Sequence, residues 1–467
     1  MRLVSFGLLA SLACASACGD NSAAGPSNTL VRVDDEPAGA NCENGGVAIH
    51  TGQDTNHNGV VDDDEITSTS YVCTASSGLR CPEGATALEG VVTVFTSADL
   101  SKLNGVTCID GDLIIAGIPD SSIPDVPLAV VTGSVTIAGN SMLTSLDGFT
   151  SLHAVGRTYA IQGNDSLDDI DTVGALDELG SVFIVGNDSL LDLAGLEGWT
   201  TIEHGITVAN NNSLQSLTGL DNLLTSNQNI TIKSNRSLTS LAALDKLRSV
   251  AVMEISGNAA LPSISLPALQ KIDVSIIMNS NAVLTTIALP ALVTTTAIQV
   301  NSNAALTTLA LPSLVVTWVL TVQVNTALTT ISAPSMAATT GDIDLTILPA
   351  LANVDFTSLG TIGGSLVLSS VPLADLSGFS ALTSIAGNFT VNGCNSLSDF
   401  AGLESLESVS GNLTLSNNAQ LTNFTGMTGS FTTVGGNLAI ISNPQLSSAT
   451  AQSFASSISV GGTVTIQ

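Results

Sequence analysis

Six potential oxygen ligands lie within the twelve residues from 54 to 65. They occupy positions 1, 3, 5, 7, 9 and 12 of that stretch, and glycine stands at position 6, where a calcium-binding loop turns sharply. Calcium takes roughly six to eight hard oxygen ligands, and this spacing folds them around one point. The sequence therefore predicts a structural calcium site; an acidic turn without a metal is the alternative. The expected ligands are the backbone carbonyl of Val60 and the side chains of Asp54, Asn56, Asn58, Asp62 and Glu65.

The segments on either side of this loop have the pattern of strands. Residues 46–49 and 66–72 alternate and are rich in β-branched side chains. We therefore expect the loop to close a hairpin within a small module over residues 37–75. Cys42 and Cys73 bracket the module, and a disulfide between them would close the open end of the hairpin.

A cysteine near the amino terminus is a candidate for lipidation. Residues 3–13 form an apolar run that is too short to span a bilayer and suits the core of a signal peptide. The small residues directly before Cys18 resemble a bacterial lipobox, which predicts a lipoprotein signal peptide over residues 1–18. Two alternatives are lipidation of Cys14 and a cleaved secretory signal without an anchor.

The next segment predicts how the chain is held at the envelope. Residues 19–36 are small and polar, as a flexible tether requires. A signal, a lipid and a tether together predict a protein bound to a membrane through its N-terminal lipid. We expect an outer-membrane lipoprotein that is exposed to the cell surface or to the periplasm. Cys81 and Cys108 bracket the following segment, and this use of cysteine fits an oxidising compartment.

Charge and composition exclude several functional classes. Ten basic residues against 39 acidic ones leave a formal charge of −29, which repels nucleic acid and anionic membrane surfaces. Residues 272–467 contain no Lys, Arg or His, so they offer no cation for a phosphate or an acidic polysaccharide. Only 10% of residues are charged and 3% aromatic, while 44% are hydrophobic. A large aliphatic core is therefore expected, and a compact enzyme, a coiled coil or a nucleic-acid binder is not.

Most of the chain consists of one repeat in fourteen copies. Apolar residues at alternate positions lead to a slot that is usually Asn, and Leu follows three residues later in every copy. Asn fills eleven slots; Leu348, Ser370 and Cys394 are the exceptions, and the apolar pattern slips by one residue at Ser370. Neighbouring slots are 22 to 25 residues apart, at positions 140, 164, 187, 211, 235, 258, 281, 303, 325, 348, 370, 394, 418 and 443.

This repeat predicts an all-β architecture of stacked coils. One unit cannot bury its own apolar face, so successive units must stack. Parallel strands about 4.8 Å apart make fourteen coils a β-solenoid on the order of 65 Å long. The Asn side chains would form a ladder along one corner, where their amides satisfy backbone groups of the turns. Cys394 is then a small buried substitute for Asn and not a reactive thiol.

The entrance to the array resembles the receptor L domain of insulin-type receptor ectodomains and fungal cell-wall proteins. The residues that carry this resemblance are Cys81-Pro-Glu-Gly, a short helix over 97–103, and a strand that begins near Cys108. Phrases of the type Gly-x-Leu-x-Leu, as at 364–368 and 411–415, open later coils in the same way. The broader pattern also resembles leucine-rich repeats.

The L-domain resemblance covers residues 81–467, with a cap over 81–117. It implies a right-handed parallel solenoid, a disulfide that joins Cys81 of the cap to Cys108 of the first strand, and a binding or structural role without catalysis. The array is longer than a single L domain and lacks the cysteine-rich partner domain of receptors. The preceding EF-hand-like loop module resembles small cysteine-bracketed modules in surface lipoproteins of myxobacteria.

Acidic residues in two neighbouring coils are the alternative to a non-catalytic role. Asp165 and Asp188 share one slot in successive coils, and Arg157 is the nearest base in sequence. Polysaccharide-acting enzymes with a parallel β-helix use clustered carboxylates, which in glycosidases lie roughly 5–10 Å apart. A solvated acidic edge is the simpler interpretation, so we predict no enzymatic activity. The other acids of this group are Asp168, Asp169, Asp171 and Asp192.

Two further features bear on partners. Thr pairs at 285–286, 307–308 and 329–330 repeat every 22 residues and would form an uncharged, hydroxyl-rich face. Such a face is suited to a repetitive surface such as a glycan, a cell wall or ice, although Thr is also common on exposed strands. The last predicted strand, 463–466, is an open edge, which predicts end-to-end self-association that truncation of this strand would abolish. The expected partner is otherwise an unknown cell-surface protein or glycan, bound in recognition, adhesion or envelope structure.

Overall fold

The computed structural model of the chain divides into two compact units, Met1–Ser76 and Ser77–Gln467. It describes residues 29–36, 46–53, 62–73, 79–170 and 178–467. The signal peptide, Cys14, Cys18 and Cys42 lie outside the described residues, as do the calcium-loop residues before Asp62. No helix in these described ranges is long and apolar enough to cross a membrane.

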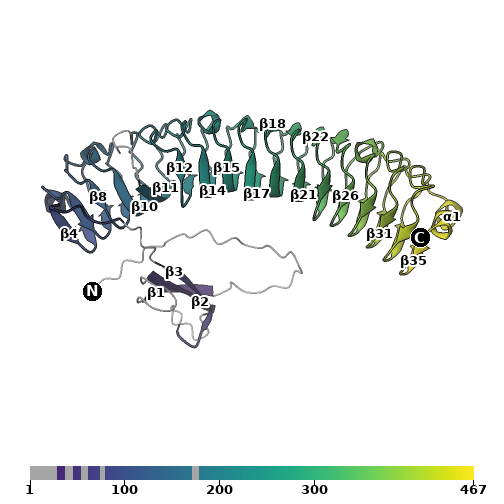
Figure 1. Cartoon of the computed structure of the whole chain (residues 1–467), viewed down its shortest axis with the longest axis horizontal. Coiled ribbons are helices and arrows are strands. Elements are labelled where there is room, and N and C mark those ends of the chain that lie inside the picture. The colour runs from purple at the N-terminus through teal and green to yellow at the C-terminus, as the bar shows by residue number, and fades with distance from the viewer. Residues whose placement is uncertain (1–28, 37–45, 54–61, 74–78, 171–177) are drawn as a thin grey trace. The chain divides into compact units, whose positions relative to one another are not determined.

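The first unit contains a three-stranded antiparallel sheet in the order β1-β2-β3 (Figure 1). Its strands are β1 (Thr29–Glu36), β2 (Gly46–Gln53) and β3 (Ile66–Cys73). The β2–β3 pair agrees with the predicted hairpin, and the predicted calcium loop connects its two strands. The tether prediction is wrong for residues 29–36, because β1 pairs with β2 along its whole length, from Thr29 opposite Gln53 to Glu36 opposite Gly46.

The second unit is a parallel β-solenoid of about 16 turns, as predicted from the repeat. Each coil pairs in parallel with the next, as Tyr159 on β10 does with Val182 on β11 and Val182 with Ile206 on β13. The first coils contain β4 (Ala87–Glu89), β5 (Val92–Val94), β6 (Cys108–Asp110), β7 (Leu113–Ala116), β8 (Val130–Val131) and β9 (Val135–Ala138). The middle coils contain β10 (Ala154–Gln162), β11 (Glu178–Val185), β12 (Thr201–Ile202), β13 (Ile206–Ala209), β14 (Thr225–Lys233), β15 (Ser249–Ser256), β17 (Lys271–Asn279), β19 (Thr294–Asn301) and β21 (Val316–Gln323).

In the last coils the long strand is divided into two short ones. These strands are β23 (Ala338–Thr339), β24 (Ile343–Thr346), β26 (Thr361–Ile362), β27 (Leu366–Ser369), β28 (Ser384–Ile385), β29 (Phe389–Asn392), β30 (Ser408–Val409), β31 (Leu413–Ser416), β32 (Thr433–Val434), β33 (Leu438–Ile441), β34 (Ser459–Val460) and β35 (Val464–Ile466). Figure 1 shows labelled strands of this sheet, such as β10, β17, β26 and β35, along the concave edge of the rod.

A second, five-stranded parallel sheet forms in the central coils only. It consists of β16 (Ser263–Ser265), β18 (Thr286–Ala288), β20 (Thr308–Ala310), β22 (Thr330–Ser332) and β25 (Asn353–Asp355). Figure 1 places β18 and β22 along the convex edge, across the core from β17 and β21. Short helices fill this position in other coils: η1 (Ser97–Leu103), η2 (Asp147–Phe149), η3 (Ala242–Leu244), η4 (Ser377–Phe379) and α1 (Ser448–Ser457).

One continuous aliphatic core runs through the solenoid. In a typical coil Val135, Ile137, Leu143 and Leu146 are each fully buried, which is the inward pattern that the repeat predicts. Burial of each such side chain contributes on the order of 1.5–3 kcal/mol, and this requires the neighbouring coil. Near the C-terminus phenylalanines join the core, and the ring of Phe454 from α1 stacks on Phe424 at a centroid distance of 3.9 Å.

The N-terminal cap is built as the L-domain resemblance implies. A disulfide joins Cys81 to Cys108 on β6, and the short helix η1 follows β5. Thr96 caps this helix by accepting the N–H of Asp99, while the Asp99 carboxylate accepts the N–H of Thr96. The cap therefore combines a covalent link with a reciprocal capping box.

Candidate functional site

The repeated Asn side chains form the predicted ladder at one corner of the solenoid. The Oδ1 atom of Asn235 accepts the backbone N–H of Asn211 in the preceding coil, at 3.1 Å. Its Nδ2 donates to the carbonyl of Val208 in the strand of that coil, at 2.9 Å. Asn235 is fully buried, and the same pair of bonds recurs at Asn164 and Asn187. The ladder is thus a structural feature that satisfies buried backbone groups.

The structure corrects the register of the slot that was placed at Ser370. The residue before each slot has a positive φ, and in this coil that residue is Ser370 itself, with φ 55°. The slot is therefore Val371, which is 1% exposed. In this coil the buried Leu373 follows the slot by two residues, whereas in the other coils Leu follows it by three. Counting back three residues from Leu373 therefore places the slot one residue too early.

Cys394 replaces Asn in the ladder without any sign of thiol chemistry. It is unpaired and 1% exposed, and its Sγ donates to the carbonyl of Leu368 at 3.5 Å, as an Asn amide does in other coils. Its backbone N–H donates to Oδ1 of Asn418. Burial raises the pKa of the thiol to about 11, so the reactive thiolate is scarce at neutral pH. The prediction of a buried substitute is confirmed.

A second polar ladder runs along the last coils and was not foreseen. Each member accepts the backbone N–H of the equivalent residue one coil further on, as Asn388 does from Asn412 at 2.8 Å and Asn412 from Asn437 at 2.7 Å. Each of these residues stands directly after a glycine and before a large apolar residue, and that position was the available signal. The ladder comprises Asp342, Ser365, Asn388, Asn412 and Asn437.

Of the predicted calcium ligands, Asp62 and Glu65 lie within the described residues. Glu65 is 6% exposed, and its Oε2 accepts the backbone N–H of Asp62 at 3.1 Å. The N–H of Glu65 in turn donates to the carbonyl of Asp62. Asp63 and Asp64 are exposed. The end of the loop is thus a tight turn that directs the Glu65 carboxylate inward, as a ligand at the last loop position requires.

The acidic residues proposed for catalysis belong to exposed turns. Asp188 accepts the amide of Asn212 at 2.7 Å, and Asp192 accepts the backbone N–H of Ala194. Arg157 lies on β10 with its Nη1 atom 4.0 Å from Oδ1 of Asp112, so the expected base is paired with a carboxylate of an earlier coil. Within the described ranges, which exclude Asp171, no three His, Cys, Asp or Glu side chains gather as a metal site would require. Asp165 and Asp168 are exposed, and Asp169 is half-buried.

The predicted Thr ladder exists as a geometric feature. Thr286, Thr308 and Thr330 pair in register on β18, β20 and β22. In the neighbouring, exposed row each hydroxyl bonds along the rod to the preceding coil, as Oγ1 of Thr307 does by donating to the carbonyl of Thr285 at 2.9 Å. Thr285 and Thr329 make the same bond to the coil before them. One of the two Thr rows is therefore used within the solenoid.

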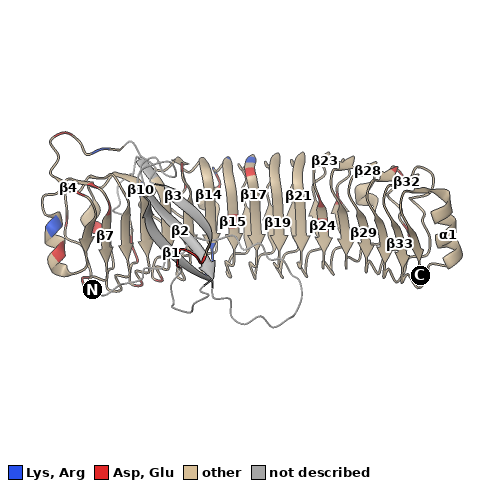
Figure 2. Ribbon diagram, turned by 90° about the horizontal axis from the view of Figure 1, so that it is seen from below, with Lys and Arg blue, Asp and Glu red and all other residues tan. Residues whose placement is uncertain are grey.

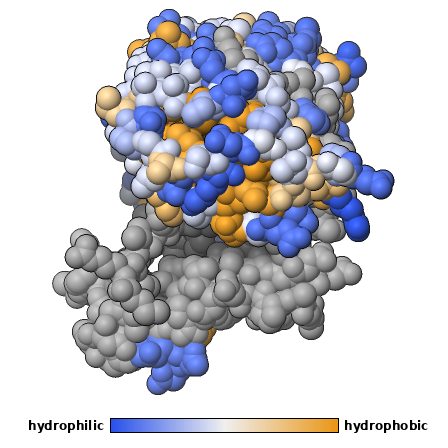
Figure 3. Space-filling model, turned by 90° about the vertical axis from the view of Figure 1, so that its left-hand side faces the viewer, coloured by the Kyte–Doolittle hydropathy of each residue, from blue (hydrophilic) through white to orange (hydrophobic). Residues whose placement is uncertain are grey.

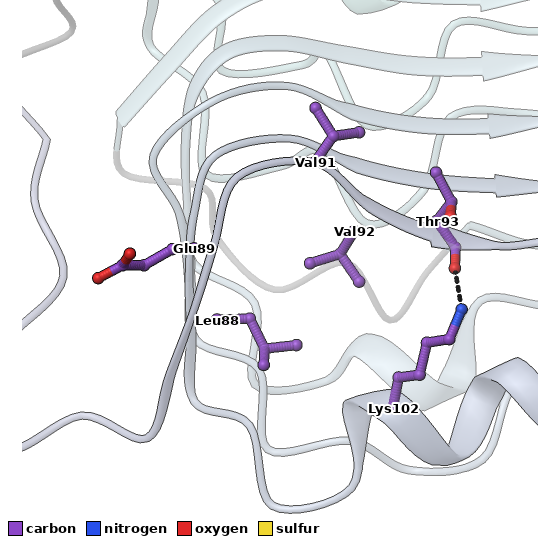
Figure 4. Close-up of a pocket in the computed structure, with 6 residues that line it drawn as sticks. All are labelled: Leu88, Glu89, Val91, Val92, Thr93 and Lys102. Atoms are coloured by element: carbon purple, nitrogen blue, oxygen red, sulfur yellow. Dashed lines mark hydrogen bonds between the residues drawn. The ribbon is translucent and has the colours of Figure 1, made fainter.

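The N-terminal end of the solenoid carries an open hollow of about 420 Å³ with a mixed polar and apolar lining. Figure 3 shows a hydrophobic area on this end of the solenoid. Figure 4 shows Lys102 reaching over it, where Nζ donates to the carbonyl of Thr93 at 2.9 Å. Lys102 also pairs with Asp99, and this bond is the main reason that the pKa of Asp99 is lowered to about 2. Lys102 lies on η1 and bonds to the terminal strand β5, and a charge beside such a strand edge discourages pairing with another chain. The hollow is lined by Leu88, Glu89, Val91, Val92, Thr93 and Lys102.

At the other end, β35 pairs only with β33 among the described strands, and its Val464 is 45% exposed. End-to-end association through this strand stays a prediction.

These features define the class of the larger unit: a repeat protein with a parallel β-solenoid fold. The smaller unit matches a family described as a domain of unknown function (DUF7151), over residues 28–73. The matched region begins next to β1 and ends at β3, so it coincides with the three-stranded sheet. No curated protein matches the chain.

Proposed function

We propose that this protein is a lipid-anchored component of a bacterial cell envelope, and that its solenoid has a non-catalytic role in recognition, adhesion or envelope structure. The Asn ladder is the observation that carries the proposal. Its amides are buried and bonded between coils, so the most repeated polar group of the chain builds the rod and is not itself available to a ligand. A rigid repeat array offers an extended surface for binding.

The cap supports an L-domain-like solenoid within this proposal. The Cys81–Cys108 disulfide and the capped helix η1 occupy the positions that the L-domain resemblance implies. Disulfides persist in oxidising compartments outside the cytosol. The net charge of −29 fits a partner that is neutral or cationic.

The anchor is tested by mass spectrometry of the protein recovered from the native envelope. We expect a diacyl or triacyl mass on Cys18, and loss of the solenoid when intact cells are treated with protease. Cys18→Ala should release the chain from the membrane fraction, whereas Cys14→Ala should leave it there. Recovery of an unlipidated soluble product would refute the anchor and favour a secreted protein.

We further propose that the loop from Asp54 to Glu65 binds calcium and stabilises the small module. The Glu65 carboxylate supports this proposal, because it is buried at the last position of the loop, where a calcium loop places its bidentate ligand. Ligands would come from the five side chains and the Val60 carbonyl named above. The role is structural, since the loop connects two paired strands and no hinged helices.

Calcium binding is expected to depend on Glu65 and not on its exposed neighbour Asp64. Glu65→Gln removes a negative charge and a bidentate ligand, so it should weaken calcium affinity about tenfold or more. Asp64→Asn removes the same charge at a non-ligand position and should change affinity about twofold at most. Isothermal titration of the mature, EDTA-treated chain measures both. Equal affinities in the two variants, or no binding by the wild type, would contradict the site.

A further inference from the structure

The centre of the solenoid is a band without charge. Between Asp273 and Asp342 the sequence contains no Asp, Glu, Lys, Arg or His, in a chain whose net charge is −29. We call residues 274–341 the uncharged belt. Figure 2 shows this part of the rod, around β19 and β21, free of charged residues. Neither a strongly cationic nor a strongly anionic partner has anything to pair with on this surface.

Exposed hydrophobic side chains gather in the same belt. Seven of the thirteen large hydrophobic side chains that are exposed among the described residues belong to it. On a soluble protein, a concentration of exposed apolar side chains often marks a binding site. The seven are Val274, Val283, Val293, Val315, Val316, Trp318 and Val324.

Trp318 is the most exposed of these seven side chains, at 57%. Trp199, the other tryptophan of the chain, is 5% exposed. The edge of its indole lies against the backbone of Gly341 in the next coil. A Cβ atom at position 341 would be 2.2 Å from Cδ1 and 2.6 Å from Nε1 of the ring. The glycine thus leaves room for the indole, which is supported from beneath and presents its surface to solvent. This arrangement is a fixed aromatic platform.

Amide side chains stand in a row on the same sheet. Asn279, Asn301 and Gln323 pair in register on β17, β19 and β21, the strand that carries Trp318. Successive members are about 4.8 Å apart along the rod, because that is the spacing of paired strands. Each is partly accessible. Oδ1 of Asn279 accepts the N–H of Asn301 at 3.0 Å, Nε2 of Gln323 donates to Asp344 at 2.7 Å, and Oδ1 of Asn301 is buried. The amide atoms that the row offers to a partner are therefore Nδ2 of Asn279, Nδ2 of Asn301 and Oε1 of Gln323. The surface therefore combines one aromatic platform with uncharged hydrogen-bonding groups at a regular interval.

We propose that this face of the uncharged belt binds a neutral polysaccharide. The apolar C–H face of one sugar ring packs on the indole, while hydroxyls of other rings of the same polymer bond to the amides, because Gln323 lies five residues beyond Trp318 on β21, roughly 16 Å along the strand. A periodic polymer suits such a periodic surface. The absence of charge in the belt matches the absence of charge in the ligand. The convex Thr face is less suited, because its strands β18, β20 and β22 carry no aromatic side chain. The hydroxyls of one of its Thr rows also donate to backbone carbonyls already.

This inference rests on the proposed role in recognition and names its ligand class. The two proposals can be refuted independently. A negative result with polysaccharides leaves the anchor intact, since a lipid on Cys18 and protease sensitivity at the cell surface do not depend on Trp318.

The test is affinity electrophoresis of the mature full-length chain in gels that contain laminarin, mannan or hydroxyethylcellulose, with alginate as an anionic control. We expect at least one neutral polymer to retard the protein and alginate to have no effect. Trp318→Ala should weaken the retardation about tenfold or more, because the aromatic platform is lost. In a Trp199→Phe background, the same polymer should shift the emission of Trp318 to shorter wavelength.

Two matched variants locate the effect. Thr308→Ala lies in the same repeat on the convex sheet, and Phe95→Ala removes another exposed aromatic, 48% exposed, outside the belt. Both should retain the affinity of the wild type within about twofold. The proposal is overturned if none of the three neutral polymers retards the chain, or if Trp318→Ala binds as well as the wild type. It is also overturned if Trp318→Ala only abolishes a dimer seen by light scattering, which would make the belt a protein interface.

Discussion

Asn235→Ala is expected to lower the free energy of unfolding of the solenoid by about 2–4 kcal/mol, because it leaves a buried backbone N–H without an acceptor and removes a second buried hydrogen bond. The N–H of Asn211 loses its acceptor, and the carbonyl of Val208 loses the amide donor. Both groups are buried at the corner, where water cannot replace the amide. Urea-induced unfolding followed by circular dichroism measures the change.

Asn212→Ala is the matched control for this prediction. Asn212 follows the neighbouring ladder residue Asn211, but it is only half-buried, and its side-chain amide contacts only the carboxylate of Asp188 among the described bonds. Its replacement should cost about 0.5 kcal/mol or less. Comparable losses in the two variants would mean that the ladder amides contribute no more than surface hydrogen bonds do.

Gly426→Ala is expected to destabilise the C-terminal coils by about 3 kcal/mol or more. Gly426 has a φ of +92°, and a Cβ atom at this position would lie 1.8 Å from the carbonyl oxygen of Phe400 in the preceding coil. The substitution therefore adds a backbone collision between coils to the cost of an unfavourable φ. Thermal unfolding and amide hydrogen exchange in the coils around Phe400 report the loss.

Gly429 in the same turn separates the two contributions. Its φ is +121°, but a Cβ atom there would meet nothing within 4 Å. Gly429→Ala should cost only the conformational penalty, about 1–2 kcal/mol. If Gly426→Ala were no worse than Gly429→Ala, the close approach of the coils at Phe400 would be in doubt.

Periodicity made the architecture of this protein predictable. Leu at a constant distance from each slot and apolar residues at alternate positions are sufficient to predict stacked parallel coils, because no single repeat can bury its own apolar face. The Asn ladder followed from the same reasoning, since a buried amide must find partners and the equivalent corner of the next coil supplies them. Cys394 fitted this scheme as a buried substitute, and its contact with Leu368 agrees.

Local features that depend on backbone conformation were predicted less well. At Ser370 the sequence pattern alone could not distinguish the corner residue from its neighbour, and the positive φ of Ser370 shows that Val371 occupies the slot. The strand β1 was mistaken for part of a tether, because its pairing with β2 is a contact between segments and has no local signature. The second polar ladder was missed for a similar reason, as Asn388 and Asn412 become partners only when the coils stack.

The sequence by itself thus determined the repeat, the inward face of each coil, the corner amides and the position of the calcium-loop pattern, since all of these depend on residue type and spacing along the chain. Tertiary structure decided which side chains remain available to a partner. Trp318 and the hydroxyl of Thr307 both belong to uncharged repeats, yet stacking leaves the indole 57% exposed above Gly341 and engages the hydroxyl with Thr285. Exposure is a property of neighbouring coils, so spacing along one coil does not specify it.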